Sequence, residues 1–143
     1  MRLGTGDLEA LQRLYSDGEP GGESPDFFIP SMVSQGVYFG VYAGSDLISA
    51  AGTHLVISEE GVGAIGNVYT RRDHRGRGLA ATVTSAVTNE LVRMNLPTIV
   101  LNVDQRNQHA IRVYERLGYA RYCAYYEGSA GSPVRVVGAI RGS

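Results

Sequence analysis

With 143 residues, of which 43% are hydrophobic and 19% charged, the chain is long and apolar enough for one globular domain, which excludes a disordered protein. Its formal net charge of -1 argues against a general nucleic-acid-binding protein, so we expect no nucleic-acid partner. The single cysteine, Cys123, excludes an intrachain disulfide framework and a cysteine-based zinc cluster, and we expect no metal.

The first half of the chain predicts a helix followed by three short strands. Leucines recur at helical spacing in TGDLEALQRLY, residues 5–15, and a glycine- and proline-rich loop follows over residues 16–26. A short helix is one interpretation of residues 31–36, after Pro30. Residues 37–58 predict two strands joined by a turn at AGSD, and AIGNVYT, residues 64–70, predicts a third. Such short turns favour antiparallel pairing.

The second half alternates helices and strands. Residues 79–95 predict a helix whose apolar stripe comprises Leu79, Val83, Ala86 or Val87, Leu91 and Met94. The strand TIVLNV, residues 98–103, is apolar on both faces and is expected to be central. A second helix, NQHAIRVYERLG, begins at Asn107 and ends at Gly118, and two strands close the chain. This order predicts an α/β fold, an α+β arrangement with one mixed sheet covered by helices on both faces.

The stretch RRDHRGRGLA, residues 71–80, collects positive charge between a strand and a helix. The helix N–H groups point back into this turn, and Gly76 and Gly78 allow close approach to the backbone, which favours a phosphate site over a solvated turn. The stretch does not match a Walker loop, because it has Gly-Leu-Ala where a Walker loop has Gly-Lys-Ser/Thr. A dinucleotide fingerprint, G-x-G-x-x-A, is a rival, but five residues separate its first glycine from the strand.

A third pattern, R-x-x-G-x-A, is matched by Arg75, Gly78 and Ala80. It resembles the pyrophosphate loop of the GNAT superfamily of N-acetyltransferases. Downstream, NQHAIRVYERLGY resembles a second conserved helix of that superfamily, N-x-x-A-x-x-x-Y-E-x-x-G-F/Y. The resemblance covers residues 37–126, with a closer likeness to the branch that includes the FR-type and glycine N-acyltransferase-like domains. It implies an acyl-CoA N-acyltransferase fold with a central, mostly antiparallel sheet flanked by helices.

The resemblance also implies acetyl-CoA as cosubstrate and a primary amine as acceptor. We expect the acetyl group to be transferred directly, because no cysteine stands in a family position for a covalent relay. The pantetheine arm would pair with the backbone of the strand that precedes the loop, and the phosphates would lie in the loop. The residues expected to bind acetyl-CoA are Val68, Tyr69, Thr70, Arg75, Gly76, Arg77, Gly78, Leu79, Ala80, Asn107, Ala110 and Tyr114.

Two residues are candidates for proton transfer. The resemblance implies that Tyr114 donates a proton to the departing thiolate, with a buried core tyrosine as the alternative. Many members of the superfamily carry a glutamate on the strand before the loop, whereas this chain has Asn67 and no carboxylate there. His54, on the preceding strand, is the candidate base because histidine is the residue type that exchanges protons near neutral pH, with a structural histidine or a water chain as alternatives.

Three functions therefore remain open: an N-acetyltransferase, a non-catalytic acyl-CoA-binding module and a dinucleotide-binding domain. The acceptor amine, a small molecule or a peptide, is not identified by the sequence. No apolar run approaches the ~18 residues of a membrane span, and the N-terminus lacks the core of a signal peptide, so we expect a cytoplasmic protein without a membrane partner. We expect a single domain over residues 1–143, with a first strand that is short or missing, and exposed sheet edges leave a homodimer open.

Overall fold

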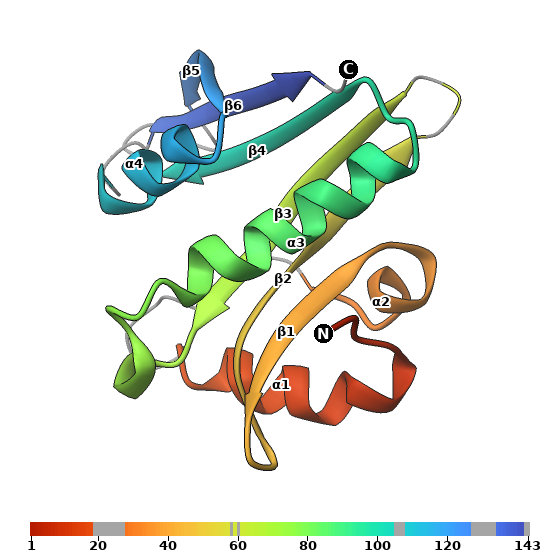
Figure 1. Cartoon of the computed structure of the whole chain (residues 1–143), viewed down its shortest axis with the longest axis vertical. Helices are drawn as coiled ribbons and strands as arrows, with labels where there is room; N and C mark the ends of the chain where they lie inside the picture. Colours follow the sequence, from red (N-terminus) through yellow and green to blue (C-terminus); the bar gives the residue numbers. More distant parts are fainter. Residues whose placement is uncertain (19–27, 58, 60, 105–107, 127–133, 142–143) are drawn as a thin grey trace.

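In the computed structural model, which describes residues 1–18, 28–57, 59, 61–104, 108–126 and 134–141, six strands form one sheet with helices on both faces (Figure 1). In chain order the elements are η1 (Thr5–Asp7), α1 (Leu8–Ser16), α2 (Ser31–Gln35), β1 (Tyr38–Ala43), β2 (Asp46–Ile57), β3 (Val62–Thr70), η4 (Arg72–His74), α3 (Leu79–Arg93), β4 (Thr98–Asp104), α4 (Gln108–Arg116), β5 (Ala120–Tyr126) and β6 (Val134–Arg141). None of the helices within this described part is long and apolar enough to cross a bilayer.

The sheet has the order β1-β2-β3-β4-β6-β5. Strands β1, β2 and β3 form the predicted antiparallel meander, and β3 pairs with β4 in parallel through the α3 crossover. Strand β4 then pairs with β6, and β6 with β5, both antiparallel. The predicted mixed, mostly antiparallel sheet is therefore confirmed, with β4 in its interior as the apolar TIVLNV run indicated.

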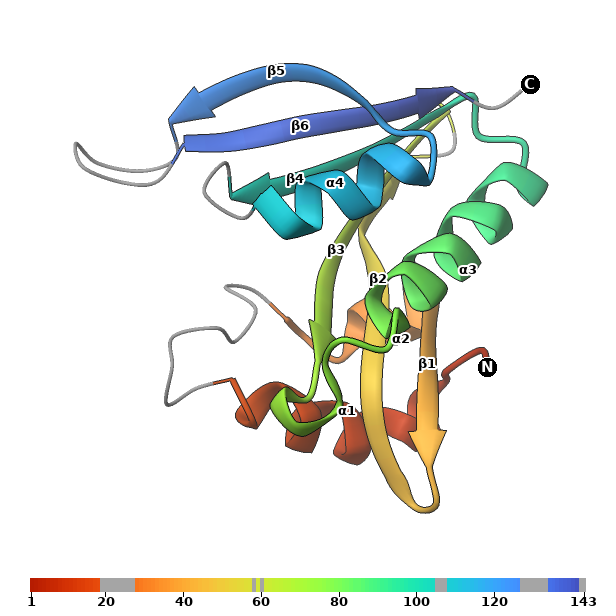
Figure 2. The same cartoon turned by 60° about the vertical axis from the view of Figure 1, so that its left-hand side comes forward.

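Two apolar clusters cover the two faces of the sheet. Helices α1 and α2 lie on one face, where Leu11 and Leu14 pack with Tyr38 of β1. Helices α3 and α4 lie on the other, where Val87 and Tyr114 are buried in the second cluster. The two helical layers are separated by the strands in Figure 2. The prediction of helices on both sides of one sheet is confirmed.

The buried stripe of α3 differs from the predicted one at its end. Val83, Val87 and Leu91 are buried as expected, but Met94 is 44% exposed. Two threonines, Thr84 and Thr88, are buried instead. Thr88 Oγ1 donates to the Thr84 carbonyl oxygen at 2.8 Å and lies 2.6 Å from the Tyr119 hydroxyl, so these hydrogen bonds satisfy the buried hydroxyl of Thr88. The prediction for Met94 is wrong because α3 ends at Arg93 and the chain turns away.

The N-terminal residues run beside β1. Arg2 forms an isolated antiparallel bridge with Phe39, and the Leu3 amide donates to the Tyr38 carbonyl oxygen at 2.8 Å. The guanidinium of Arg2 also reaches Glu90 on α3 at 2.7 Å. This short segment therefore joins the β1 edge to the α3 layer.

We expect Leu91→Ala to lower the free energy of unfolding by about 2–5 kcal/mol, because Leu91 is fully buried and alanine would leave a cavity. Met94→Ala, on the same helix end, is expected to change it by less than about 0.5 kcal/mol, as for an exposed side chain. Urea denaturation followed by circular dichroism measures both. Equal losses in the two variants would contradict the observed burial of α3.

Candidate functional site

Strands β3 and β4 pair over only part of their length. Their parallel ladder runs from Val62↔Thr98 to Ile65↔Leu101, whereas β3 continues to Thr70. Beyond Ile65 the two strands diverge, as Figure 2 shows. The segment that contains the predicted residues Val68, Tyr69 and Thr70 therefore lies where β3 has left its parallel neighbour.

The glycine turn follows the end of β3. Gly76 and Gly78 have φ of 83° and 74°, in the left-handed region that favours glycine, and an added Cβ would meet no atom within 4 Å at either position. Gly78 is the N-cap of α3 and has no side chain to cap it, and the first turn of α3 contains no acidic residue. The N–H groups of Leu79 and Ala80 therefore belong to an uncapped helix N-terminus, where an anion is favoured.

The arginines of the turn have different partners. Arg71 forms an ion pair with Asp73 at 2.8 Å. Arg75 Nε donates to the Thr70 carbonyl oxygen at 3.0 Å, and its guanidinium lies 5.3 Å from the centre of the Tyr69 ring, so this side chain folds back onto β3. Arg77 is exposed and has no ion pair or hydrogen bond with a described residue. Of the two arginines predicted to meet a phosphate, Arg77 is the one whose charge is not engaged.

Asp17, at the end of α1, anchors the start of the turn. Its Oδ2 accepts hydrogen bonds from the Arg72 amide at 3.1 Å and from the Tyr69 hydroxyl at 2.9 Å. The hydrogen bond from the Arg72 amide and the positive charges of the nearby arginines hold the pKa of the Asp17 carboxyl below its usual range. The position of the glycine turn is therefore tied to α1.

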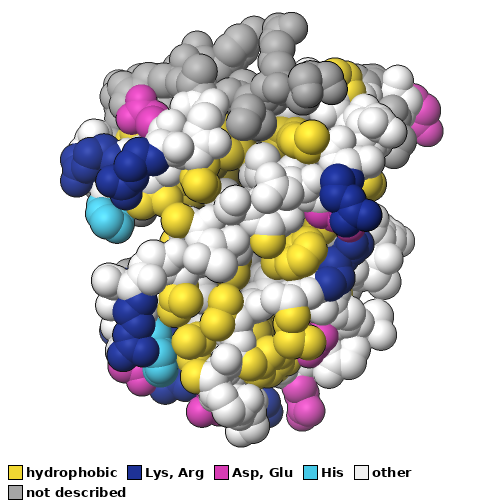
Figure 3. Space-filling model, in the orientation of Figure 1, with side chains coloured by type: hydrophobic (Ala, Val, Ile, Leu, Met, Phe, Trp, Pro, Cys, Tyr) yellow, Lys and Arg dark blue, Asp and Glu magenta, His cyan; other side chains and the backbone are white. Residues whose placement is uncertain are grey.

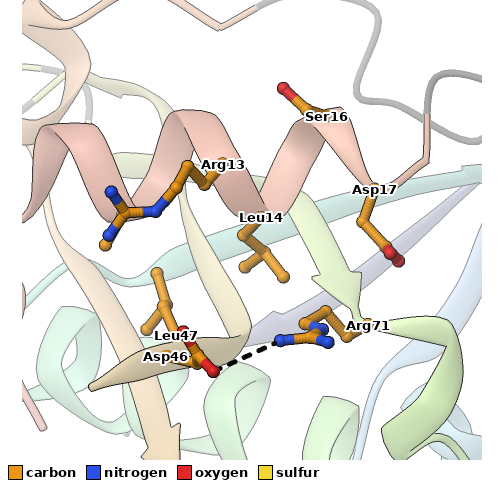
Figure 4. A pocket seen from close by; sticks show the side chains of 8 residues that line it. Arg13, Leu14, Ser16, Asp17, Asp46, Leu47 and Arg71 are labelled. Atoms are coloured by element: carbon orange, nitrogen blue, oxygen red, sulfur yellow. Dashed lines mark ion pairs between the residues drawn. The ribbon is translucent and has the colours of Figure 1, made fainter.

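A pocket of about 290 Å³ opens beside this anchor, between α1 and the start of β2 (Figure 4). It is lined by Ala10, Arg13, Leu14, Ser16, Asp17, Asp46, Leu47 and Arg71. The Arg71 guanidinium lies 3.8 Å from the Asp46 carboxylate across it. None of the residues predicted to bind acetyl-CoA or to transfer a proton lines this pocket, which lies behind the start of the turn at Arg71 and Asp17.

Tyr114 lies on the α3/α4 face of the sheet. It is 8% exposed, and its ring meets that of Tyr119 edge-on with centroids 6.5 Å apart. Burial, with a smaller effect of the Tyr119 phenol, raises the pKa of Tyr114 to about 12. Val68 of β3 and Ala110 of α4 border the same cluster, so the fold brings these three predicted residues to one face. Asn107 lies outside the described residues.

The surface of this face is apolar in its middle and basic at one edge. In Figure 3, apolar side chains show between α3 and α4, and arginine and histidine side chains gather above and below them at the left. Helix α4 exposes His109, Arg112 and Arg116 at helical spacing. The apolar strip therefore runs toward a positively charged rim.

His54 lies on the opposite, α1/α2 face. Its ring packs against the backbone of Gly66, where an added Cβ would overlap it. Its Nε2 is 2.9 Å from Oδ1 of Asn67, a 7% exposed residue with φ of 53°. In the sequence, Asn67 stands out only as the residue found where many members of the superfamily carry a glutamate. The Gly-Asn pair inside a strand was the signal for a local bulge that turns this side chain toward His54.

The predicted base and the predicted acid therefore lie on opposite faces of the sheet, on either side of β3. Val68 faces α3 and α4, whereas the Tyr69 ring packs on the α1 side. Among the histidine, cysteine, aspartate and glutamate side chains of the described ranges, no group of three could hold a metal ion.

Comparisons with known proteins agree with this architecture. A family model described as FR47-like protein matches residues 38–127. The mycothiol acetyltransferase of Streptomyces avermitilis is 37% identical over 67 residues, which are 47% of this chain and 22% of that protein. The N-alpha-acetyltransferase 30 of Schizosaccharomyces pombe is 34% identical over 55 residues, 38% of this chain and 37% of that protein. The chain thus spans a minor part of the length of either relative.

Solved structures with low identity share the fold over the full chain. The ribosomal-protein-S18-alanine N-acetyltransferase from Escherichia coli superposes with a TM-score of 0.76 at 20% identity, over 100% of this chain and 92% of that one. A proposed acetyltransferase from Salmonella typhimurium, solved with its cofactor acetyl-CoA, gives 0.83 at 13% identity, again over 100% and 92%.

Proposed function

The chain belongs to the family of FR47-like proteins, a branch of the GNAT superfamily of acetyltransferases, and on this basis we propose that it transfers an acetyl group from acetyl-CoA directly to a primary amine. The match to the family model and the acetyltransferases among its relatives support an acyltransferase enzyme. The resemblance drawn from the glycine turn and the α4 motif is thereby confirmed.

One observation carries the proposal: β3 continues beyond the part that pairs with β4, and the glycine turn then joins it to the uncapped N-terminus of α3. Acetyl-CoA has the matching shape, an extended arm with amides that ends in a pyrophosphate. The amides of the arm pair with backbone groups of Val68, Tyr69 and Thr70 as an added strand would. The pyrophosphate then meets the N–H groups of residues 77–80, where the helix dipole favours negative charge.

The glycines and the arginines of the turn contribute to phosphate binding in different ways. Gly76 and Gly78 leave open space where side chains would stand, so phosphate oxygens reach the backbone. Arg77, without a partner among the residues described, supplies a charge-assisted hydrogen bond. Arg75, which is bonded to the Thr70 carbonyl, holds the turn against β3 and adds its positive charge to the site.

Tyr114 donates to the sulfur of the leaving group. With a pKa of about 12 its phenol keeps its proton throughout the neutral range. The leaving thiol, with a pKa of ~8.5, is the stronger acid, so an early complete transfer is unfavourable. Tyr114 therefore acts first as a hydrogen-bond donor whose bond strengthens as the C–S bond breaks. Its proton passes to the departing thiolate, and water, which receives the amine proton from His54, returns a proton to the Tyr114 phenolate.

His54 removes the proton of the attacking amine. Nucleophilic attack needs a neutral amine, and an imidazole in its neutral form accepts a proton near physiological pH. The amine nitrogen forms the new bond to the acetyl carbon, the C–S bond breaks, and the proton lost by nitrogen passes to His54 and then to water. No covalent acetyl-enzyme is part of this scheme.

Calorimetric titration with acetyl-CoA tests the donor, and a screen of amines, amino acids and peptide N-termini for acetyl-dependent release of thiol tests the transfer. We expect acetyl-CoA to bind more tightly than NAD, and at least one class of amine to release thiol. Binding without transfer to any member of the panel would favour the acyl-CoA-binding module. An absence of binding at millimolar acetyl-CoA, or tighter binding of NAD, would contradict the proposal.

A further inference from the structure

A directed hydrogen-bond chain on the α1/α2 face ends at His54. Asn67 Nδ2 donates to the Tyr38 hydroxyl at 2.8 Å and lies 3.7 Å from Met32 Sδ. The Tyr38 hydroxyl in turn donates toward Met32 Sδ at 3.9 Å. Both donors of this chain therefore point toward Met32, and the Asn67 amide has its nitrogen on the Tyr38 side.

This orientation leaves Oδ1 of Asn67 to face His54, at 2.9 Å from Nε2. An amide oxygen only accepts hydrogen bonds, so the proton between the two groups must belong to the imidazole. The neutral ring of His54 is thus held with hydrogen on Nε2 and with the lone pair on Nδ1, because the partner of one ring nitrogen decides the state of the other.

The backbone holds Asn67 in this position. Its φ of 53° lies in the left-handed region that asparagine tolerates better than most residues, and its carbonyl oxygen accepts a 2.8 Å hydrogen bond from the Tyr15 hydroxyl. Gly66, next to it, leaves the space in which the ring of His54 lies. Asn67 is therefore fixed through its backbone, its amide nitrogen and its amide oxygen.

We propose that Asn67 is a positioning residue, which holds His54 in the Nε2–H form so that Nδ1 accepts the proton of the incoming amine. The inference rests on the proposed function, in which His54 is the base. When Nδ1 takes up the proton, the imidazolium keeps its Nε2–H···Oδ1 hydrogen bond, and the neutral amide gains no charge. The proton then leaves from Nδ1 to water, which restores the starting form of the ring.

Among the described residues around His54, few groups would compete for this proton. The phenols of Tyr38 on β1 and Tyr15 on α1 stay protonated near neutral pH, because burial raises the pKa of Tyr38 to about 12 and that of Tyr15 well above its usual value. Helix α2 carries no acidic or basic residue. Within the described part of the chain, His54 forms no ion pair.

Two substitutions that tolerate a positive φ at residue 67 test the inference. Asn67→Asp puts a carboxylate beside Nε2, and we expect the titration midpoint of the His54 ring, followed by 15N NMR, to rise by about one pH unit, because an opposite charge favours the imidazolium. The acid limb of kcat should move to higher pH by the same amount. Asn67→Gly removes the amide, and kcat should fall about tenfold with an unchanged KM for acetyl-CoA.

The matched control is Asn95→Gly, since Asn95 has a similar φ of 62° and is exposed in the α3–β4 connection. It should leave both the His54 titration and kcat unchanged. His54→Gln identifies the His54 resonances among those of the three histidines. A midpoint in Asn67→Asp equal to that of the unchanged protein, or full kcat in Asn67→Gly, overturns the role of Asn67. An unchanged protein that acetylates no amine overturns the proposed function instead, and the NMR titration still decides whether Asn67 holds the ring.

Discussion

Gly78→Ala is expected to weaken acetyl-CoA binding roughly 10- to 100-fold, the loss that corresponds to one charge-assisted hydrogen bond between backbone and phosphate. Gly78 has φ of 74° and occupies the N-cap position of α3, and an added methyl group would meet no protein atom within 4 Å. The methyl group would instead occupy space from which a phosphate reaches the first N–H groups of α3. Strain of the left-handed backbone should lower the free energy of unfolding by only about 1–2 kcal/mol. Calorimetry measures binding, and urea denaturation measures stability.

Gly44→Ala separates these two effects. Gly44, in the turn between β1 and β2, has φ of 62° and is equally free of atoms within 4 Å of an added Cβ. It should show the same loss of stability as Gly78→Ala and bind acetyl-CoA as the unchanged protein does. A Gly78→Ala variant that binds acetyl-CoA with full affinity would contradict phosphate binding at this turn.

Tyr114→Phe is expected to lower kcat by about 100-fold, the lower end of the range for a positioned proton donor, while KM for acetyl-CoA stays the same. The phenol contributes only when charge develops on the sulfur, so its loss affects the transition state and not the bound substrate. Because burial holds the pKa of Tyr114 at about 12, its proton is present at every pH used in an ordinary assay. The loss of rate should therefore be the same at pH 7 and pH 9. Steady-state kinetics at both values provide the measurement.

Tyr119→Phe is the matched control for Tyr114→Phe. Both tyrosines are buried at the α3/α4 face and their rings touch, but Tyr119 is bonded to Thr88 at 2.6 Å. Loss of the Tyr119 hydroxyl should lower the free energy of unfolding by about 1 kcal/mol, as for a buried hydrogen bond, and leave kcat near that of the unchanged protein. A similar fall of kcat in both variants would indicate damage to the shared interface, and Tyr114 would lose its role as donor.

Most of the fold was predictable from local patterns. Short turns such as AGSD set the antiparallel meander, and the apolar run TIVLNV predicted an interior strand. Apolar periodicity failed on α3, because Met94, just after its last residue, is exposed, and Thr84 and Thr88 within the helix are buried. From polarity alone, Met94 would be buried and the threonines exposed. Thr88 is buried because it is hydrogen-bonded to the Tyr119 hydroxyl, a partner 31 residues away along the chain that local patterns do not predict.

The site was predictable only in its backbone. Glycine spacing located the turn at the start of α3, since residues with positive φ are mostly glycine. Side-chain partners could not be read in the same way. Arg75 folds back to Thr70, and His54 meets Asn67 across two strands. Such contacts depend on the register of β2 and β3, which shifts twice between Ala50 and Leu55.

The placement of His54 and Tyr114 on opposite faces of the sheet has a consequence for the routes by which the two substrates enter. On the proposed scheme, the amine approaches from the α1/α2 layer and acetyl-CoA from the α3/α4 layer, and they meet where β3 has parted from β4. Each substrate then has its own entrance, so neither must leave before the other enters. Apart from Asp17, which ties α1 to the glycine turn, the layer that selects the acceptor can then change in sequence with little effect on the layer that recognises the donor.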